Sequence, residues 1–344
     1  MKRPTINDLA DHAGVSPSTV KRLLHGRERV RPETVERILR AAEDINYYGI
    51  NTLRSRRKEN LPQRSLGFLL QQSHRSVYQQ WADAIKLAAA RDNTATILPI
   101  VEFEDDLAPE AIARQLLLMG EQVDAIAVVT SDHPLVSNAI DELKEKGVPV
   151  VAYISDLSAP NRAGFVGTDN WRAGRTAAWF ITQLAKEDAA ILPLVGSHRY
   201  QCQDFSDSSF RSYVREHATQ FNVLETQLTQ EEPDIAYDLV KQSLAEEPNL
   251  GGIFVNGGGV SGVLRALQEL PPSRQQQIKV VCRDMGAEAR KGLQQSIITA
   301  ALCHPAERMS RELISLMLDV IERQKGGNMQ QRIVPFSIAT PESI

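Results

Sequence analysis

The chain has few cysteines and no long apolar run, although it extends over 344 residues. Its three cysteines, Cys202, Cys282 and Cys303, are odd in number and widely spaced, which argues against a disulfide framework and against a cysteine metal site. No window approaches the roughly 18 consecutive apolar residues of a membrane helix. The N-terminal stretch MKRPTINDLA has no apolar segment typical of a signal peptide. We therefore expect a cytoplasmic protein with reduced thiols, without a metal and without membrane contact.

The composition is that of an ordinary soluble protein, with 42% hydrophobic and 24% charged residues, and the length suits two or three domains. The charge is unevenly distributed. Residues 1–64 contain 14 Lys and Arg against 8 Asp and Glu, a net charge of +6, whereas the remainder carries 25 against 35, a net charge of −10. A basic head on an acidic body indicates that the head meets a polyanion.

The head predicts three short helices with a tight turn between the first two. Thr5 is a suitable N-cap for the first helix, and Gly14 stands where a left-handed residue would end it. Ser16 and Pro17 then form the N-cap and first turn of a second helix. A third helix begins near Pro32. This arrangement is typical of a helix-turn-helix, in which the second helix enters the DNA major groove. The alternative is a small three-helix bundle for protein contacts.

The stretch TINDLADHAGVSPSTVKRLLHGRERVRPETVERILRAAEDINY, residues 5–47, resembles the head of the LacI (lactose-repressor) family of bacterial transcription regulators. The family usually has Ser at the positions of Lys21 and Arg31, so both differences add positive charge here. The DNA-contacting residues that the helix pattern and the resemblance imply are Thr5, Ser16, Pro17, Ser18, Thr19, Lys21, Arg22, His25, Arg31, Leu53, Arg54 and Arg56.

The last three of these residues lie in a basic linker, residues 49–63. In the family this segment folds into a short helix on DNA, and a Leu from each subunit enters the minor groove. Alignment without gaps puts Arg56 at that position, with Leu53 one turn earlier. Either Leu53 is the minor-groove wedge, or an arginine enters the groove instead. A plain solvated linker is the third possibility.

From Leu66 onward, strand-like and helix-like runs alternate, with helices expected near 77–91, 108–120, 134–147, 170–185, 205–218, 234–247 and 306–325. This alternation predicts an α/β fold with parallel sheets covered by helices on both faces. So many strands suit two doubly wound sheets. The body, and VGTDNWRAGR within it, resembles the family's effector domain, which has the fold of periplasmic sugar-binding proteins. The resemblance implies two lobes that close on a small ligand.

Ligand groups in open α/β sheets gather at the carboxyl ends of strands. The candidates for effector contact are Gln72, His74, Tyr78, Trp81, Asp132, Tyr153, Asp169, Arg199, Asn256, Asp284 and His304. The resemblance favours Asp169, Asn256 and Asp284, since a carboxylate accepts from two adjacent hydroxyl groups of a sugar or polyol. One departure affects this assignment: Ser206 stands where the family commonly carries an Arg. Arg199, Gln203 and Asp204 are the candidates to replace it.

One glycine-rich motif indicates a different function. Gly257, Gly259 and Gly262 spell GxGxxG after a β-branched run, and Asp284 follows some twenty residues later, as in a dinucleotide fingerprint. The alternative function is an NAD(H)-binding redox regulator or oxidoreductase. However, the motif lies deep in the body, and no nucleophile–base constellation for catalysis is evident. We expect the glycines to pack a helix against its sheet or to face the effector cleft.

The sequence therefore predicts a DNA-binding transcriptional regulator, a repressor rather than an enzyme, with no cofactor. Its partners are a near-palindromic double-stranded operator, a small sugar-like or polyol effector and a second copy of the chain. The expected domains are the head (1–48), the linker (49–63) and the effector-binding and dimerisation domain (64–344). Within the last, lobe 1 is expected over 64–157 and 295–328, and lobe 2 over 162–292 and 329–344.

Overall fold

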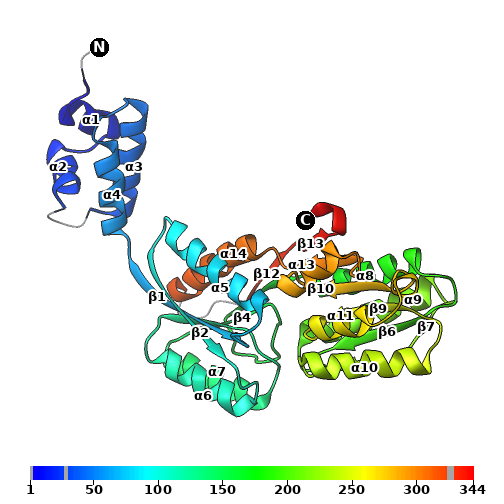
Figure 1. Ribbon diagram of the computed structural model, residues 1–344. Helices are drawn as coiled ribbons and strands as arrows, with labels where there is room; N and C mark the ends of the chain where they lie inside the picture. Colours follow the sequence, from blue (N-terminus) through cyan, green and yellow to red (C-terminus); the bar gives the residue numbers. More distant parts are fainter. Residues whose placement is uncertain (1–2, 27–29, 324–328) are drawn as a thin grey trace. The chain divides into compact units, whose positions relative to one another are not determined.

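The computed structural model describes residues 3–26, 30–323 and 329–344, with only the backbone of residues 32 and 56–60. The chain divides into two compact units (Figure 1). One comprises the residues up to Ser65 together with Ala89–Leu98, and the other comprises Leu66–Ala88 and Pro99–Ile344. Each unit is described by itself.

The N-terminal helices form a small bundle, which we call the head. Their bounds are α1 Ile6–Ala13, α2 Pro17–His25, α3 Pro32–Asp44 and α4 Ile50–Asn60. The predicted apolar stripes meet in one core, which includes Leu9, Val20, Leu23 and Ile38. A core this small leaves most of the α2 surface available for contacts outside the head.

The predicted helix ends of the head are confirmed. Thr5 and Asp8 form a capping box, because the Thr5 hydroxyl accepts from the Asp8 amide and the Asp8 carboxylate accepts from the Thr5 amide. Gly14 has φ +63°, the left-handed conformation that ends α1. Ser16 caps α2 by accepting from the Thr19 amide. Local hydrogen bonds and the Gly14 conformation therefore fix where α1 ends and where α2 begins.

The body contains two mainly parallel sheets. The first lobe is built on the sheet of order β12-β5-β4-β3-β1-β2. Helices α5 and α14 lie on one face of this sheet and α6 and α7 on the other (Figure 1). Its elements are β1 Gln63–Gln71, α5 Ser76–Arg91, β2 Thr96–Glu104, α6 Pro109–Gly120, β3 Ala125–Val128, α7 Pro134–Glu145, β4 Val150–Tyr153, β5 Gly164–Thr168, α14 Ala306–Glu322 and β12 Gln330–Val334.

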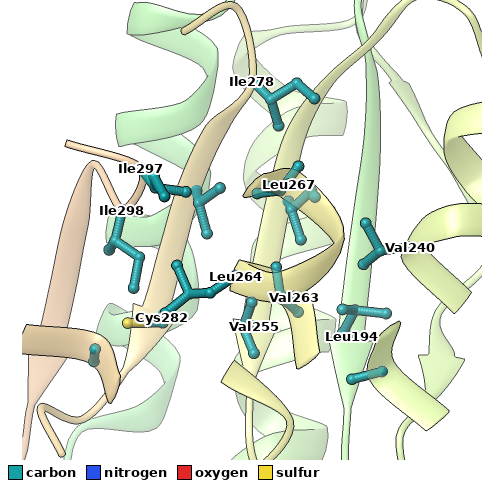
Figure 2. Close-up of a cluster of buried hydrophobic side chains, with 14 of the residues drawn as sticks. Leu194, Val240, Val255, Val263, Leu264, Leu267, Ile278, Cys282, Ile297 and Ile298 are labelled. Atoms are coloured by element: carbon teal, nitrogen blue, oxygen red, sulfur yellow. The ribbon is translucent and has the colours of Figure 1, made fainter. Parts of the chain in front are cut away.

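The second lobe is built on the sheet of order β13-β11-β10-β9-β6-β7, with β8 paired to β6. Alternate residues of each strand enter opposite cores: Val255 and Cys282 pack under α10, α11 and α13 (Figure 2), whereas Phe254 packs under α8 and α9. Its elements are α8 Asn170–Leu184, β6 Ala190–Val195, α9 Gln201–His217, β7 Asn222–Val223, β8 Gln227–Leu228, α10 Pro233–Glu246, β9 Leu250–Asn256, α11 Val260–Gln268, α12 Pro272–Gln275, β10 Lys279–Arg283, α13 Ala287–Gln294, β11 Ala300–Cys303, β13 Ser337–Ala339 and the 3-10 turn η1 Pro341–Ser343.

The two-sheet α/β architecture is confirmed, but the crossings between the lobes come later than expected. β5 still belongs to the first sheet, β11 to the second and β12 to the first, so the chain crosses after Thr168, after Cys303 and after Val334. The expected crossings near residues 160, 293 and 328 were therefore wrong. Strand patterns locate a strand but do not say which sheet it joins, because hydrogen-bond partners are distant in the sequence.

Candidate functional site

The exposed face of α2 carries the polar and basic side chains that the head offers for contact. Pro17, Ser18, Lys21, Arg22 and His25 are exposed, while Val20 and Leu23 are buried beneath them. The hydroxyl groups of Ser16 and Ser18 lie 2.7 Å apart at the N-terminus of the helix. An exposed basic face on the second helix of a helix-turn-helix is suited to the major groove.

The candidate DNA-contacting residues of the linker differ in how exposed their side chains are. Leu53 has 0% exposure and belongs to the head core, so in this structure it is not a minor-groove wedge. α4 turns the apolar side chain of Leu53 inward, where burial is favourable, and its role on DNA stays a prediction. Arg54 is exposed and donates to Glu43 of α3 at 2.8 Å. The side chain of Arg56 lies outside the described residues. Arg31 is exposed at the start of α3, where it provides no side-chain cap.

A cavity of about 170 Å³ opens at the carboxyl ends of strands from both sheets of the body. Six of the candidate effector residues line it: His74, Tyr78, Trp81, Asn256, Asp284 and His304. Two others lie beside it. Gln72 accepts from Arg75 at 2.8 Å, and the Tyr153 ring contacts the Trp81 ring with centroids 6.2 Å apart. The structure therefore gathers most of the candidates in one place.

Three candidates lie elsewhere. Asp169 caps α8 by accepting from the Arg172 amide at 2.9 Å, and it lines a different surface depression. Asp132 and Arg199 line a third, open groove, where the Asp132 amide donates to the Arg199 carbonyl oxygen at 2.8 Å. None of these three residues lines the cavity. Each follows a strand, but the loop that carries it turns away from the cavity.

The substitution at the family's usual Arg position has a structural explanation. Ser206 is fully buried, and its hydroxyl donates to the carbonyl oxygens of Cys202 and Asn170. It therefore faces α8 rather than the cavity. Of its three suggested replacements only Gln203 lines the cavity, where its Nε2 donates to Glu231 at 2.8 Å.

Sequence reasoning missed Arg283, a cavity residue that is only 7% exposed. Its Nη2 donates to Thr168 Oγ1 at 3.1 Å and to His304 Nε2 at 3.0 Å, whereas its Nη1 is buried without a hydrogen-bond partner. Such an orphaned donor is expensive to leave unsatisfied. It is the donor that an oxygen of a bound ligand would satisfy. A buried arginine directly before Asp284 was the available signal.

Hydrogen bonds link Arg283 to Asp284 through His304. His304 Nε2 accepts from Arg283, so Nδ1 carries the proton and donates to Asp284 Oδ1 at 2.6 Å. Burial, together with the charge of Arg283, lowers the pKa of His304 although Asp284 opposes this. Burial would raise the pKa of Asp284, but its contact with His304 and the charge of Arg283 hold it below its ordinary value. The result is a neutral imidazole between two opposite charges.

The glycine-rich turn is explained by packing. Gly257 and Gly259 have φ of +155° and +103°, which side chains rarely adopt. A Cβ on Gly262 would overlap the carbonyl oxygen of Pro233, so this glycine lets α11 pack directly against α10. Among the described residues of the body, the glycines of this motif allow backbone segments to approach one another closely. Cys202, which also lines the cavity, has a pKa raised by burial to about 11, so its thiol stays protonated.

A helix-turn-helix head joined to a two-lobed body with a cavity at the strand ends defines a ligand-responsive DNA-binding regulator. The chain belongs to the lacI family of bacterial regulatory proteins: residues 5–49 match that family, and residues 66–325 match the periplasmic binding protein domain. The matches of the head and of the body therefore agree with the fold of each part. No described helix is long and apolar enough to cross a membrane.

The chain is similar to known regulators over most of its length. It is 24% identical over 328 residues to the sucrose operon repressor of Pediococcus pentosaceus, covering 93% of each chain. It is 22% identical over 333 residues to the HTH-type transcriptional repressor PurR of Pectobacterium carotovorum, covering 93% of this chain and 91% of that one. Among solved structures, a glucose-galactose binding protein from Geobacillus stearothermophilus has a TM-score of 0.72 at 17% identity, covering 82% of this chain and 98% of its own.

Proposed function

We propose that this protein is a transcriptional repressor that binds a near-palindromic operator as a homodimer and responds to a small neutral effector in the cavity. In this proposal residues 1–48 bind DNA, residues 49–63 connect, and residues 64–344 bind the effector and dimerise. It acts where the DNA is, in the cytoplasm, and catalyses no reaction. The observation that carries the DNA-binding part is the capped α2 with its exposed basic face.

Two copies related by a two-fold axis present two α2 helices to half-sites that repeat in opposite orientation. Ser18, Lys21 and Arg22 are the side chains on the exposed face that reach base edges or phosphates. Thr5, Ser16 and Thr19 lie at or near helix N-termini, where hydroxyl and amide groups suit phosphate oxygens. Arg54 contacts a phosphate by giving up its exposed ion pair with Glu43.

The head is tested by Arg22→Ala. An operator is first selected from random duplexes with the full chain, and affinity is then measured by fluorescence anisotropy. We expect a loss of about 1–3 kcal/mol in binding free energy if Arg22 reads a base, and a reduced salt slope if it contacts phosphate. Arg215→Ala, an exposed arginine of α9, is the control. Affinity and salt slope equal to those of the control would refute the assigned face.

The charge balance of the cavity favours a neutral effector. Glu231 faces Arg75 at 2.6 Å, and Arg283 is linked to Asp284 through His304, so these four buried or half-buried charges are compensated within the protein. A charged ligand would introduce a charge without a counter-charge. A hydroxylated ligand instead satisfies Arg283 Nη1 and donates to Asp284, while Trp81 offers an apolar ring.

The cavity volume limits the size of the effector in this arrangement. Its volume of about 170 Å³ is close to that of a cavity known in another protein, about 150 Å³, that holds one benzene ring. We therefore propose a ligand of about one ring, such as a monosaccharide or cyclic polyol. The effector changes operator affinity only if it binds the two conformations of the dimer with different affinity.

A thermal-shift screen of the full chain against monosaccharides, cyclic polyols, disaccharides, phosphosugars and NAD(H) tests the effector class. A ligand at a hundredfold excess over its Kd stabilises the folded state by about 2.7 kcal/mol. We expect a shift with a neutral single-ring compound and none with the same compound in Asp284→Asn. A shift only with NAD(H) or phosphosugars would refute the neutral-effector proposal.

A further inference from the structure

Two charged side chains from opposite lobes meet in the wall of the cavity. Arg75 follows β1 of the first lobe, and Glu231 follows β8 of the second. Arg75 Nη1 donates to Glu231 Oε2 at 2.6 Å, and the two residues are 156 positions apart in the sequence. The Glu231 side chain is only 6% exposed and that of Arg75 24%. We call these two residues the interlobe pair.

The second lobe is shaped to hold the Glu231 carboxylate. Gly196, Gly257 and Gly258 surround it so closely that a Cβ on any of them would collide with the Glu231 side chain. Gln203 Nε2 donates to Oε1 at 2.8 Å, and the Gly196 amide in turn holds Gln203 by donating to its Oε1 at 2.6 Å. Glu231 itself has φ +65°, a conformation that costs free energy for a non-glycine residue. Two of the three glycines belong to the glycine-rich turn after β9.

The first lobe also holds Arg75 in place. Arg75 Nη1 also donates to Gln72 Oε1 at 2.8 Å, and the guanidinium lies over the Tyr78 ring at 5.2 Å from its centroid. Gln72, like Glu231, is held in a left-handed conformation with φ +44°. Both partners are therefore positioned by their own lobes before they meet, which lowers the entropic cost of pairing.

Further hydrogen bonds join the same two lobes around the interlobe pair. The Tyr200 hydroxyl donates to Gln71 Oε1 at 2.9 Å, and the Ser76 hydroxyl donates to Glu288 Oε2 at 3.0 Å. The Glu288 contact is exposed and the Tyr200 contact is buried. The lobes thus meet through the protein's own polar groups.

We propose that Glu231 acts as an internal ligand: by pairing with Arg75 it holds the two lobes closed without an effector. The closed arrangement is then the resting state of the body, and the effector binds beside the interlobe pair instead of bringing the lobes together. This proposal rests on the proposed function for the identity of the cavity as the effector site. It also explains why the glycine-rich turn lacks side chains, because they would displace the carboxylate.

Trp81 provides a direct reporter of closure. It is 5% exposed on the first lobe, and its ring contacts that of His304 from the second lobe at 5.8 Å. The other tryptophans, Trp171 and Trp179, are about half exposed on α8. In the full chain carrying Trp171→Phe and Trp179→Phe, Trp81 is the only tryptophan. Its accessibility to acrylamide then measures whether the lobes are open.

Glu231→Gln removes the charge while keeping the shape of the side chain, and Arg75→Gln removes the opposite charge. Glu231→Asp keeps the charge but withdraws it by one methylene, and serves if Glu231→Gln does not fold. Without any effector, we expect each variant to raise the acrylamide quenching constant of Trp81 about twofold or more, because an appreciable open population exposes the ring. The double variant should show no greater effect than the larger single one.

Asp234→Asn is the matched control. Asp234 lies three residues beyond Glu231. The substitution breaks its ion pair with Arg265 at 2.6 Å, and both partners of that pair belong to the second lobe. We expect no change in Trp81 quenching. Quenching in the Glu231 and Arg75 variants that equals the control would overturn the internal-ligand proposal, and so would easy quenching of Trp81 in the parent chain. DNA affinity is measured separately, so a parent chain that does not bind DNA would overturn the proposed function and leave the quenching result standing.

Discussion

The stability of the body should depend on pH through His304. The imidazole is buried and neutral in the folded chain, since burial and Arg283 lower its pKa. In the unfolded chain a histidine has a pKa of about 6.5. Between the lowered folded pKa and 6.5 the unfolded state therefore binds more protons than the folded state. Stability is then fully present above pH 6.5 and is lost as the pH falls.

The size of the effect follows from linkage. If the imidazole stays neutral in the folded state throughout, moving from pH 7.5 to pH 5.5 protonates it almost completely in the unfolded state alone. The free energy of unfolding then falls by about 1.4 kcal/mol. The Asp284 carboxylate adds little over this range, because its lowered folded pKa and the unfolded value of about 3.9 both lie below it.

The assay compares urea unfolding of the parent chain and of His304→Asn at the two pH values, followed by tryptophan fluorescence. All three tryptophans lie in the body, so the signal reports that unit. The amide of Asn can still donate to Asp284 but does not titrate. The six other histidines are common to both proteins and cancel in the difference. An equal loss of stability in both proteins would refute the neutral, buried imidazole.

The remaining predictions concern packing. Gly262→Ala should force α11 away from Pro233 and destabilise the body by about 2 kcal/mol, lowering Tm by about 4–8 °C in calorimetry. An unchanged Tm would show that the glycine is not needed for packing. Leu53→Ala should destabilise the head by about 2–5 kcal/mol, because it removes a fully buried side chain. Hydrogen exchange of α1 to α3 checks this: normal protection combined with weakened DNA binding would instead identify Leu53 as a wedge.

The local features of this fold could be read from the sequence because their causes are local. Thr5, Gly14 and Ser16 mark helix ends through hydrogen bonds and backbone conformations within a few residues of themselves. The alternation of strands and helices in the body follows from apolar periodicity, which identified most helix positions to within a few residues. α9 begins at Gln201 rather than near residue 205, and the short helices α12 and α13 were not expected.

The cavity could be predicted only in part. Asn256 is the last residue of β9, and Asp284 and His304 directly follow β10 and β11, so position alone was enough to select them. Asp169 and Asp132 also follow strands, yet Asp169 caps its own helix and Asp132 lines another groove. The direction in which a loop turns depends on what it packs against, and a strand pattern does not contain that information.

The sequence by itself determined the class of this protein: the basic helix-turn-helix head, the two-sheet body and the general position of the cavity arise from short-range signals. Only the tertiary structure decided which charges meet. Arg283 Nη2 donates to Thr168 and His304 while Nη1 is left without a partner, and Arg75 meets Glu231, 156 positions away in the sequence. Pairings of this kind are set by how two sheets pack and where the chain crosses between them, so no periodicity in the sequence records them.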